Sequence, residues 1–252
     1  MRKSGILFLL LTPALWAQVV LSVSVNGASD TRLSPGWSLI VEATLRAENA
    51  NQRVTVAPSD WAQALTISIY AEDGTPAPVT LQWTAAPPAS AELSSPAELN
   101  ILLTLSPDTT QALAAGNYAL QARLDASSSA AGAWTGSAES ATAILTVAPP
   151  PEEPTPAELL AKLLLDARYT ELTGDSAGAV AILNSWLEQQ PDSIPALTLK
   201  AEILQAAGSL DEAVATVESA IRAVRNSAPA GSHPPRLLYL LRNEMLAQLL
   251  GQ

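Results

Sequence analysis

The stretch Pro149-Pro150-Pro151-Glu152-Glu153-Pro154-Thr155-Pro156-Ala157-Glu158 divides the chain into two parts of different character. Proline fixes its own backbone angle and lacks an amide hydrogen, so the run at 149–154 predicts a stiff linker. Directly after it, Thr155 can cap a helix, Pro156 stands where no amide hydrogen is needed, and Glu158 can close a capping box. The sequence therefore predicts one domain that ends at 148 and a helical one that begins at 155.

Before the linker, residues 18–148 alternate between apolar and polar side chains. One apolar and one polar face is typical of strands in an antiparallel sheet that is buried on one side. Turn-forming segments rich in Gly, Pro and Asp separate the alternating runs. Seven or eight short strands over about 130 residues predict a β-sandwich. The expected strands lie near 19–25, 39–46, 54–56, 65–69, 79–83, 99–105, 118–124 and 141–147.

One local motif sharpens this prediction. The segment Leu113-Ala114-Ala115-Gly116-Asn117-Tyr118 leads directly into the strand expected to end at Leu124. It resembles the tyrosine corner of immunoglobulin-like sandwiches, in which a Tyr hydroxyl hydrogen-bonds to backbone a few residues upstream. The resemblance implies an immunoglobulin-like architecture for residues 18–148. It does not extend to the cysteine pair of antibody domains, because the chain has no cysteine.

After the linker, the sequence repeats itself with a period of 34 residues. Small and large residues recur at this offset in six pairs: Gly174 and Gly208, Ala167 and Ala201, Ala179 and Ala213, Leu163 and Leu197, Leu183 and Val217, Leu187 and Ile221. Two helices per 34-residue unit are the signature of the tetratricopeptide repeat, which this region resembles. Asp166 and Lys200 depart from the family pattern, since they stand where the family usually carries Leu.

The resemblance implies two repeats and a capping helix within residues 155–252, so the expected fold is multi-domain, all-β followed by all-α. Repeat stacks generally need about three units to bury a continuous core. We therefore expect the β-sandwich or another molecule to pack against the two repeats and supply the rest of the burial. The family's first helices line a groove for peptides or partner helices. The candidate partner-binding residues implied by the family's spacing are Leu164, Arg168, Glu171, Thr198, Glu202 and Gln205. The alternative is that these are plain exposed helix faces and that the contact surface lies elsewhere.

The first 17 residues read as a signal peptide. Arg2 and Lys3 form a basic start, an unbroken apolar run follows at 6–11, and small residues precede the change of polarity at Gln18. Cleavage is expected after Ala17, with Ala14 as the alternative. About a dozen apolar residues are too few to span a bilayer, so we expect an exported chain, periplasmic or secreted, with no stable membrane span after cleavage.

Composition excludes several classes of function. The absence of cysteine excludes disulfides and thiolate metal sites, and His233 is the single histidine, so multi-histidine metal centres are excluded as well. A net charge of −11 argues against nucleic-acid binding, which needs clustered Lys and Arg. His233 lies in a loop without flanking acidic residues, which favours a plain loop role over catalysis. We expect no catalytic residues, no metal site and no cofactor.

The sequence therefore predicts a non-enzymatic scaffold that binds a protein or peptide partner through its repeat helices, in an envelope, secretion or surface-assembly complex. The alternative is a β-sandwich that binds a glycan or small ligand and is stabilised by the helices. That alternative rests on Trp37, Trp61, Trp83 and Trp134, which could form a sugar platform. Tryptophans spread over four segments are more typical of core packing.

Overall fold

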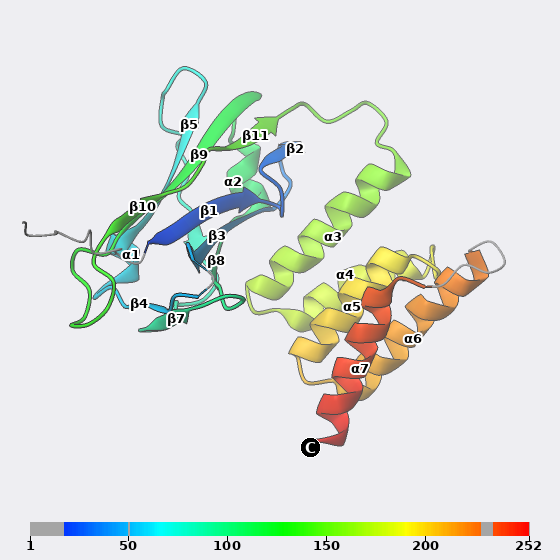
Figure 1. Cartoon of the computed structure of the whole chain (residues 1–252). Coiled ribbons are helices and arrows are strands. Elements are labelled where there is room, and N and C mark those ends of the chain that lie inside the picture. Colours follow the sequence, from blue (N-terminus) through cyan, green and yellow to red (C-terminus); the bar gives the residue numbers. More distant parts are fainter. Residues whose placement is uncertain (1–17, 50, 228–233, 252) are drawn as a thin grey trace, which may run out of the picture.

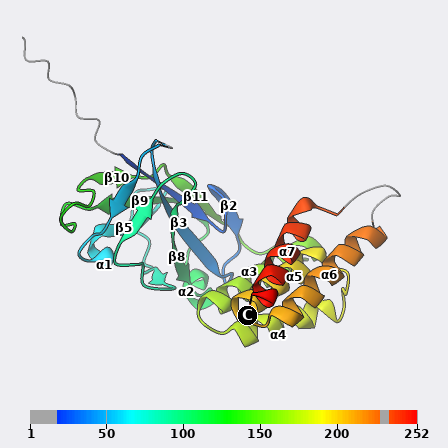
Figure 2. The same cartoon turned by 60° about the horizontal axis from the view of Figure 1, so that its bottom comes forward.

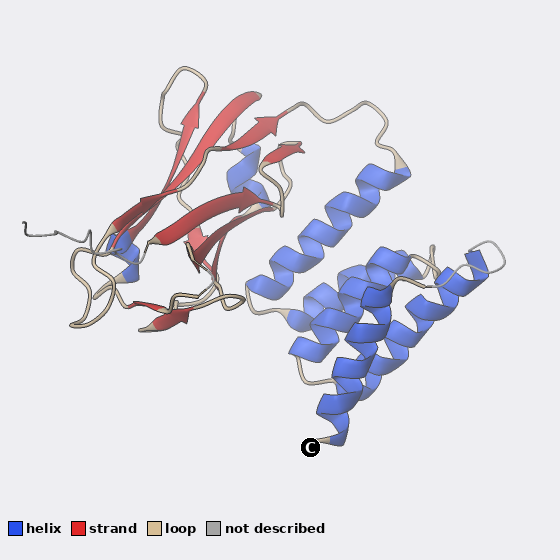
Figure 3. Cartoon of the chain, viewed as in Figure 1, coloured by secondary structure: helices blue, strands red, loops and turns tan. Residues whose placement is uncertain are grey.

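The structure is a computed structural model that describes residues 18–49, 51–227 and 234–251. Two regions are distinct within it, a β-sandwich followed by a bundle of helices. Figure 3 shows the long helices gathered apart from the strands, and in the chain they all follow the last strand. The expected signal peptide at 1–17 and His233 lie outside the described residues, so both remain predictions.

Two sheets form the sandwich (Figure 1). The first sheet has the order β1 (Val19–Val25), β3 (Leu39–Ala47), β8 (Leu99–Leu105) and β6 (Gln82–Trp83). In the second, β9 (Gly116–Asp125) pairs along one edge with β5 (Leu65–Ala71), and along the other with β10 (Ser137–Glu139) and β11 (Ala143–Val147). Strand β2 (Asp30–Leu33) extends that sheet beside β11. Smaller elements are β4 (Val54–Val56), β7 (Ala91–Leu93), α1 (Trp61–Ala64) and α2 (Pro107–Gln111).

The core lies between the two sheets and follows the predicted alternation. Every second residue is buried in β1, in β3 from Leu39 to Leu45, and in β9 from Tyr118 to Leu124. All four sandwich tryptophans pack in or against this core. The tyrosine corner is confirmed, because the Tyr118 hydroxyl donates a hydrogen bond to the Ala114 carbonyl at 2.9 Å.

Four differences from the expected strands have a common cause. Strands β2, β7 and β10 were not predicted, and the run expected at 79–83 forms a strand only at Gln82–Trp83. Each of these strands has two to four residues and at most one buried side chain, which is too short for a period of two to show. Strand β2 also pairs parallel with β11, whereas every other strand pair within the described residues is antiparallel.

Five helices follow the linker: α3 (Pro156–Leu172), α4 (Ser176–Leu187), α5 (Ile194–Ala206), α6 (Leu210–Ser227) and α7 (Arg236–Leu250). The predicted capping box begins α3. The Glu158 amide donates to Thr155 Oγ1 at 3.2 Å, and the Thr155 amide donates to Glu158 Oε2 at 2.8 Å. The Thr155 hydroxyl also donates to Glu158 Oε2 at 2.8 Å, and the two hydrogen bonds that the carboxylate accepts from Thr155 lower the pKa of Glu158.

The 34-residue period corresponds to helical hairpins. Helices α3 and α4 form the first, α5 and α6 the second, and α7 packs against α6. Gly174 and Gly208 follow α3 and α5 with φ angles of 94° and 80°, a left-handed backbone that glycine adopts without strain. The alanines of the repeat are completely buried because they lie where two helices approach closely: Ala167, Ala179, Ala201 and Ala213.

Candidate functional site: a groove between the two domains

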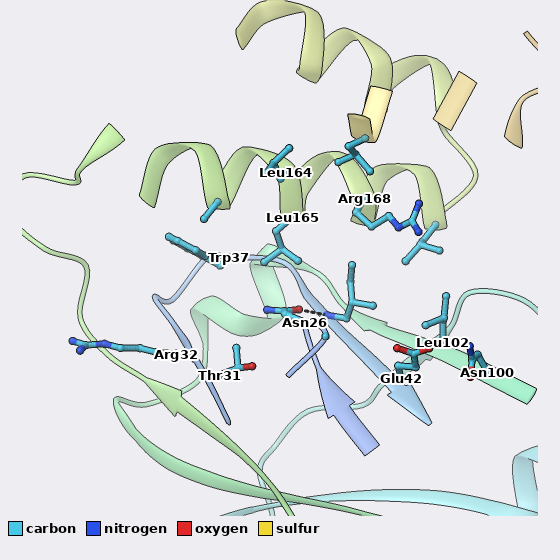
Figure 4. A pocket seen from close by; sticks show the side chains of 15 residues that line it. Asn26, Thr31, Arg32, Trp37, Glu42, Asn100, Leu102, Leu164, Leu165 and Arg168 are labelled. Carbon is cyan, nitrogen blue, oxygen red and sulfur yellow. Dashed lines mark hydrogen bonds between the residues drawn. The ribbon is translucent and has the colours of Figure 1, made fainter. Parts of the chain in front are cut away.

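Helix α3 faces the sandwich along one side, so the first repeat does not stand free in solution (Figures 1 and 2). An open groove of about 680 Å³ lies between α3 and the outer face of the first sheet. The β3 and β8 strands and the turn between β1 and β2 form the opposite wall. Figure 4 shows side chains from both domains converging on this space. We call it the interdomain groove.

The lining of the interdomain groove is mainly apolar. Trp37, Ile40 and Leu102 come from the sandwich, and Leu164, Leu165, Leu172 and Leu199 come from the helices. Charged side chains line it as well, namely Arg32, Glu42 and Arg168. The turn that forms part of the sandwich wall is fixed by Asn26, whose Oδ1 accepts a hydrogen bond from the Ile40 amide at 2.9 Å (Figure 4).

A polar contact joins the two domains beside the groove. The Ser38 hydroxyl, directly before β3, donates to Asp166 Oδ1 of α3 at 2.9 Å. Ser38 is fully buried, and the same carboxylate pairs with Lys162 one helical turn earlier. Asp166 is one of the residues that depart from the repeat pattern. Its position against the sandwich explains why a carboxylate stands there in place of an apolar side chain.

Charged residues meet where α3 approaches α5. Arg168 Nη1 lies 3.3 Å from Glu171 Oε2, and the Glu171 side chain is only 16% exposed. Burial raises the pKa of Glu202, the nearby Glu171 raises it further, and Arg168 opposes both effects. Arg168, Glu171 and Glu202 therefore form one electrostatic cluster at the end of the interdomain groove.

The six candidate residues fall into separate environments. Leu164 and Arg168 line the interdomain groove, whereas Glu171 and Glu202 belong to the adjacent cluster. Gln205 faces α7, where its amide nitrogen donates to Gln248 Oε1 at 3.2 Å. The Thr198 hydroxyl donates to the Ile194 carbonyl within α5. Whether these residues bind a partner stays a prediction.

The sandwich wall was missed by sequence reasoning, although a signal for it exists. In β3 and β8 the outward positions expected to be polar include Ile40 and Leu102. Apolar residues on both faces of a strand indicate that both faces are covered. The core covers the inner face of these strands, and α3 lies across the groove from Ile40 and Leu102 on their outer face.

The described residues contain neither a cluster of metal ligands nor a membrane-spanning helix. No group of three or more metal-ligating side chains occurs among 18–49, 51–227 and 234–251. In the same part of the chain, no helix combines the length and apolar character that crossing a bilayer requires.

Comparisons with known proteins agree with the helical part of this description. Curated protein sequences yield no significant match. One solved structure that resembles part of the chain is the CARDB domain of a Pyrococcus furiosus protein, determined in complex with di-metal ions. It is 11% identical, covers 53% of this chain and 90% of its own, and superposes with a TM-score of 0.29. The C-terminal helical region, at residues 172–232, matches the family model described as tetratricopeptide repeat.

Proposed function

We propose that this chain is an exported, non-enzymatic scaffold that holds a segment of a protein partner in the interdomain groove. The observation that carries the proposal is the tetratricopeptide match at residues 172–232, since this family typically mediates protein–protein interaction without catalysis. The groove adds a surface to which both domains contribute. A partner bound there would bury the apolar helix surface that two repeats and a capping helix leave exposed.

The lining of the interdomain groove suggests the chemistry of the partner segment. Its walls offer leucines, Trp37 and Ile40, which suit apolar side chains. Arg168 is already paired with Glu171, whereas Arg32 has no carboxylate within 4.0 Å among the described residues. We therefore propose a largely apolar segment with an acidic residue placed opposite Arg32.

Peptides selected from a random library for binding to the full chain would test whether the interdomain groove is the binding site. Leu164→Glu and Leu102→Glu each place a charge on one wall, so the selected peptides should bind at least about tenfold more weakly, because an apolar contact then buries a charge. Ala181→Glu is the matched control, since Ala181 is exposed on α4 and outside the groove. Unchanged affinity in both groove variants would contradict the proposal, and saturable glycan binding by the full chain would favour the alternative.

Export rests on the N-terminal sequence alone and has its own test. A chain expressed with residues 1–17 and recovered outside the cytoplasm should begin at Gln18, or at Leu15 if cleavage follows Ala14. N-terminal sequencing distinguishes the two. Full-length protein retained in the cytoplasm would contradict export and leave the groove experiment unaffected.

A further inference from the structure

Three arginines converge on a small pocket between the last two described helices. Glu218, Ile221, Arg222 and Arg225 lie along one face of α6, spaced three to four residues apart, and Arg242 comes from α7. The pocket has a volume of about 260 Å³ and shares no residue with the interdomain groove. We call it the arginine pocket.

Neutral side chains hold all three guanidinium groups. Arg222 Nη2 donates to Ser219 Oγ at 2.9 Å, and Arg242 Nη2 donates to Asn243 Oδ1 at 3.3 Å. Arg225 Nη2 donates to the Tyr239 hydroxyl at 3.1 Å. The Arg242 guanidinium also lies 5.5 Å from the centroid of the Tyr239 ring. Tyr239 therefore positions arginines from two helices at once.

The positive charge of the arginine pocket is only partly compensated, because three arginines face one carboxylate and none is ion-paired among the described residues. Within the described residues, no carboxylate lies within 4.0 Å of Arg222, Arg225 or Arg242, although Glu218 lines the same pocket. The Nε atom of Arg242 is buried and has no hydrogen-bond partner there. Cations near the C-terminus of a helix are favoured by its dipole, which accounts for Arg225 at the end of α6. It does not account for Arg242 in the middle of α7.

We propose that the arginine pocket binds carboxylate groups of an acidic segment of a protein partner. A guanidinium donates through a planar fork that matches a carboxylate, and hydrogen bonds between charged groups are about twice as strong as neutral ones. Three of the chain's 13 basic residues line this one pocket while the whole chain carries −11. That net charge repels any long polyanion, a nucleic-acid backbone included, so the pocket suits a short acidic segment that meets the arginines locally. This site is independent of the proposed interdomain groove.

Fluorescence anisotropy of labelled hexaglutamate with the full chain tests the proposal, with hexaglutamine as the uncharged peptide. The native chain should bind hexaglutamate saturably, and added salt should weaken the binding. The double variant Arg222→Gln/Arg225→Gln should bind at least about tenfold more weakly. Both arginines are exposed, so the fold should persist, which thermal unfolding checks. Arg236→Gln is the matched control, because Arg236 is exposed on α7 outside the pocket, and it should stay within about twofold.

A second double variant separates guanidinium geometry from charge alone. Arg222→Lys/Arg225→Lys keeps both charges but removes the planar forks, so it should also lose affinity. Full affinity in the lysine variant, or an equal loss in Arg236→Gln, would overturn the proposal. The absence of saturable binding by the native chain would overturn it too. Tighter binding of oligo-dT through the same arginines would reassign the pocket to nucleic acid and refute the carboxylate assignment.

Discussion

Ser38 and Asp166, 128 residues apart in sequence, form a 2.9 Å hydrogen bond that joins the β-sandwich to the first repeat helix. The donor is completely buried, and the acceptor also pairs with Lys162. A buried hydroxyl that loses its acceptor costs about 1–3 kcal/mol. This contact therefore helps to fix how α3 lies against the first sheet, and with it the shape of the interdomain groove.

Replacing Asp166 should loosen the two domains. Asp166→Ala removes the acceptor of Ser38, so we expect the free energy of unfolding in urea to fall by about 1–3 kcal/mol. The chain has no cysteine, so cysteines introduced at exposed Gln121 and Ala181 can carry two spin labels without side reactions. The label-to-label distance distribution should broaden in Asp166→Ala. Asp192→Ala, in an exposed loop, is the control, and a distribution as narrow as that of the control would show that Asp166 does not hold the domains.

The tyrosine corner gives a second prediction. Tyr118→Phe keeps the buried ring and removes only the hydroxyl that donates to the Ala114 carbonyl. The free energy of unfolding should fall by about 0.5–1.5 kcal/mol, the net contribution of one such hydrogen bond. Tyr70→Phe is the control, because Tyr70 is 39% exposed, and it should change stability by less than about 0.5 kcal/mol. Equal losses in the two variants would assign no special role to the corner.

The buried alanines of the repeat give a third prediction. Ala213 of α6 is fully buried, and two residues further on Ala215 of the same helix is exposed. Ala213→Leu forces extra volume between close helices and should lower the free energy of unfolding by about 1–3 kcal/mol. Ala215→Leu adds the same side chain on the solvent side and should be nearly neutral. Urea unfolding followed by circular dichroism compares the two, and equal stabilities would contradict the close packing.

The features that could be predicted from sequence are those encoded by local spacing. The 34-residue offset between Ala167 and Ala201 is visible in the printed chain, because close helix packing demands a small residue at each. The capping box at Thr155 and the corner at Tyr118 likewise involve atoms only a few residues apart. Each is a local pattern with a single favourable geometry.

The site could not be predicted in the same way, because it depends on how two domains meet. Spacing within the repeats placed Leu164 and Arg168 on one face of α3, but it could not show that this face looks onto Ile40 and Leu102 of the sandwich. The departure at Asp166 was visible as an anomaly of the repeat pattern. Its partner Ser38 lies beyond the linker, and no local period connects the two.

Glu202 gives a prediction about pH. Burial raises the pKa of Glu202 in the folded chain, so the folded state holds the proton more tightly than the unfolded chain, whose value is near 4.5. The ionised side chain therefore destabilises the fold above the raised pKa, and this cost disappears as pH falls towards 4.5. Glu202→Gln should then raise the urea midpoint at pH 7.5 and leave it unchanged at pH 4.0. The gain should stay below about 1 kcal/mol, because the side chain is only half-buried and solvent screens its charge.

Burial sets the sign of this effect, and the two charged neighbours of Glu202 change its size. Glu171 adds to the rise in pKa, whereas Arg168 opposes it. Glu153→Gln, in the exposed linker, is the control and should shift neither midpoint. A lower midpoint for Glu202→Gln at pH 7.5 would mean that attraction to Arg168 outweighs burial, so that the ionised carboxylate stabilises the fold. Repeating the measurement in an Arg168→Gln background should enlarge the gain from Glu202→Gln, because the opposing positive charge is then gone.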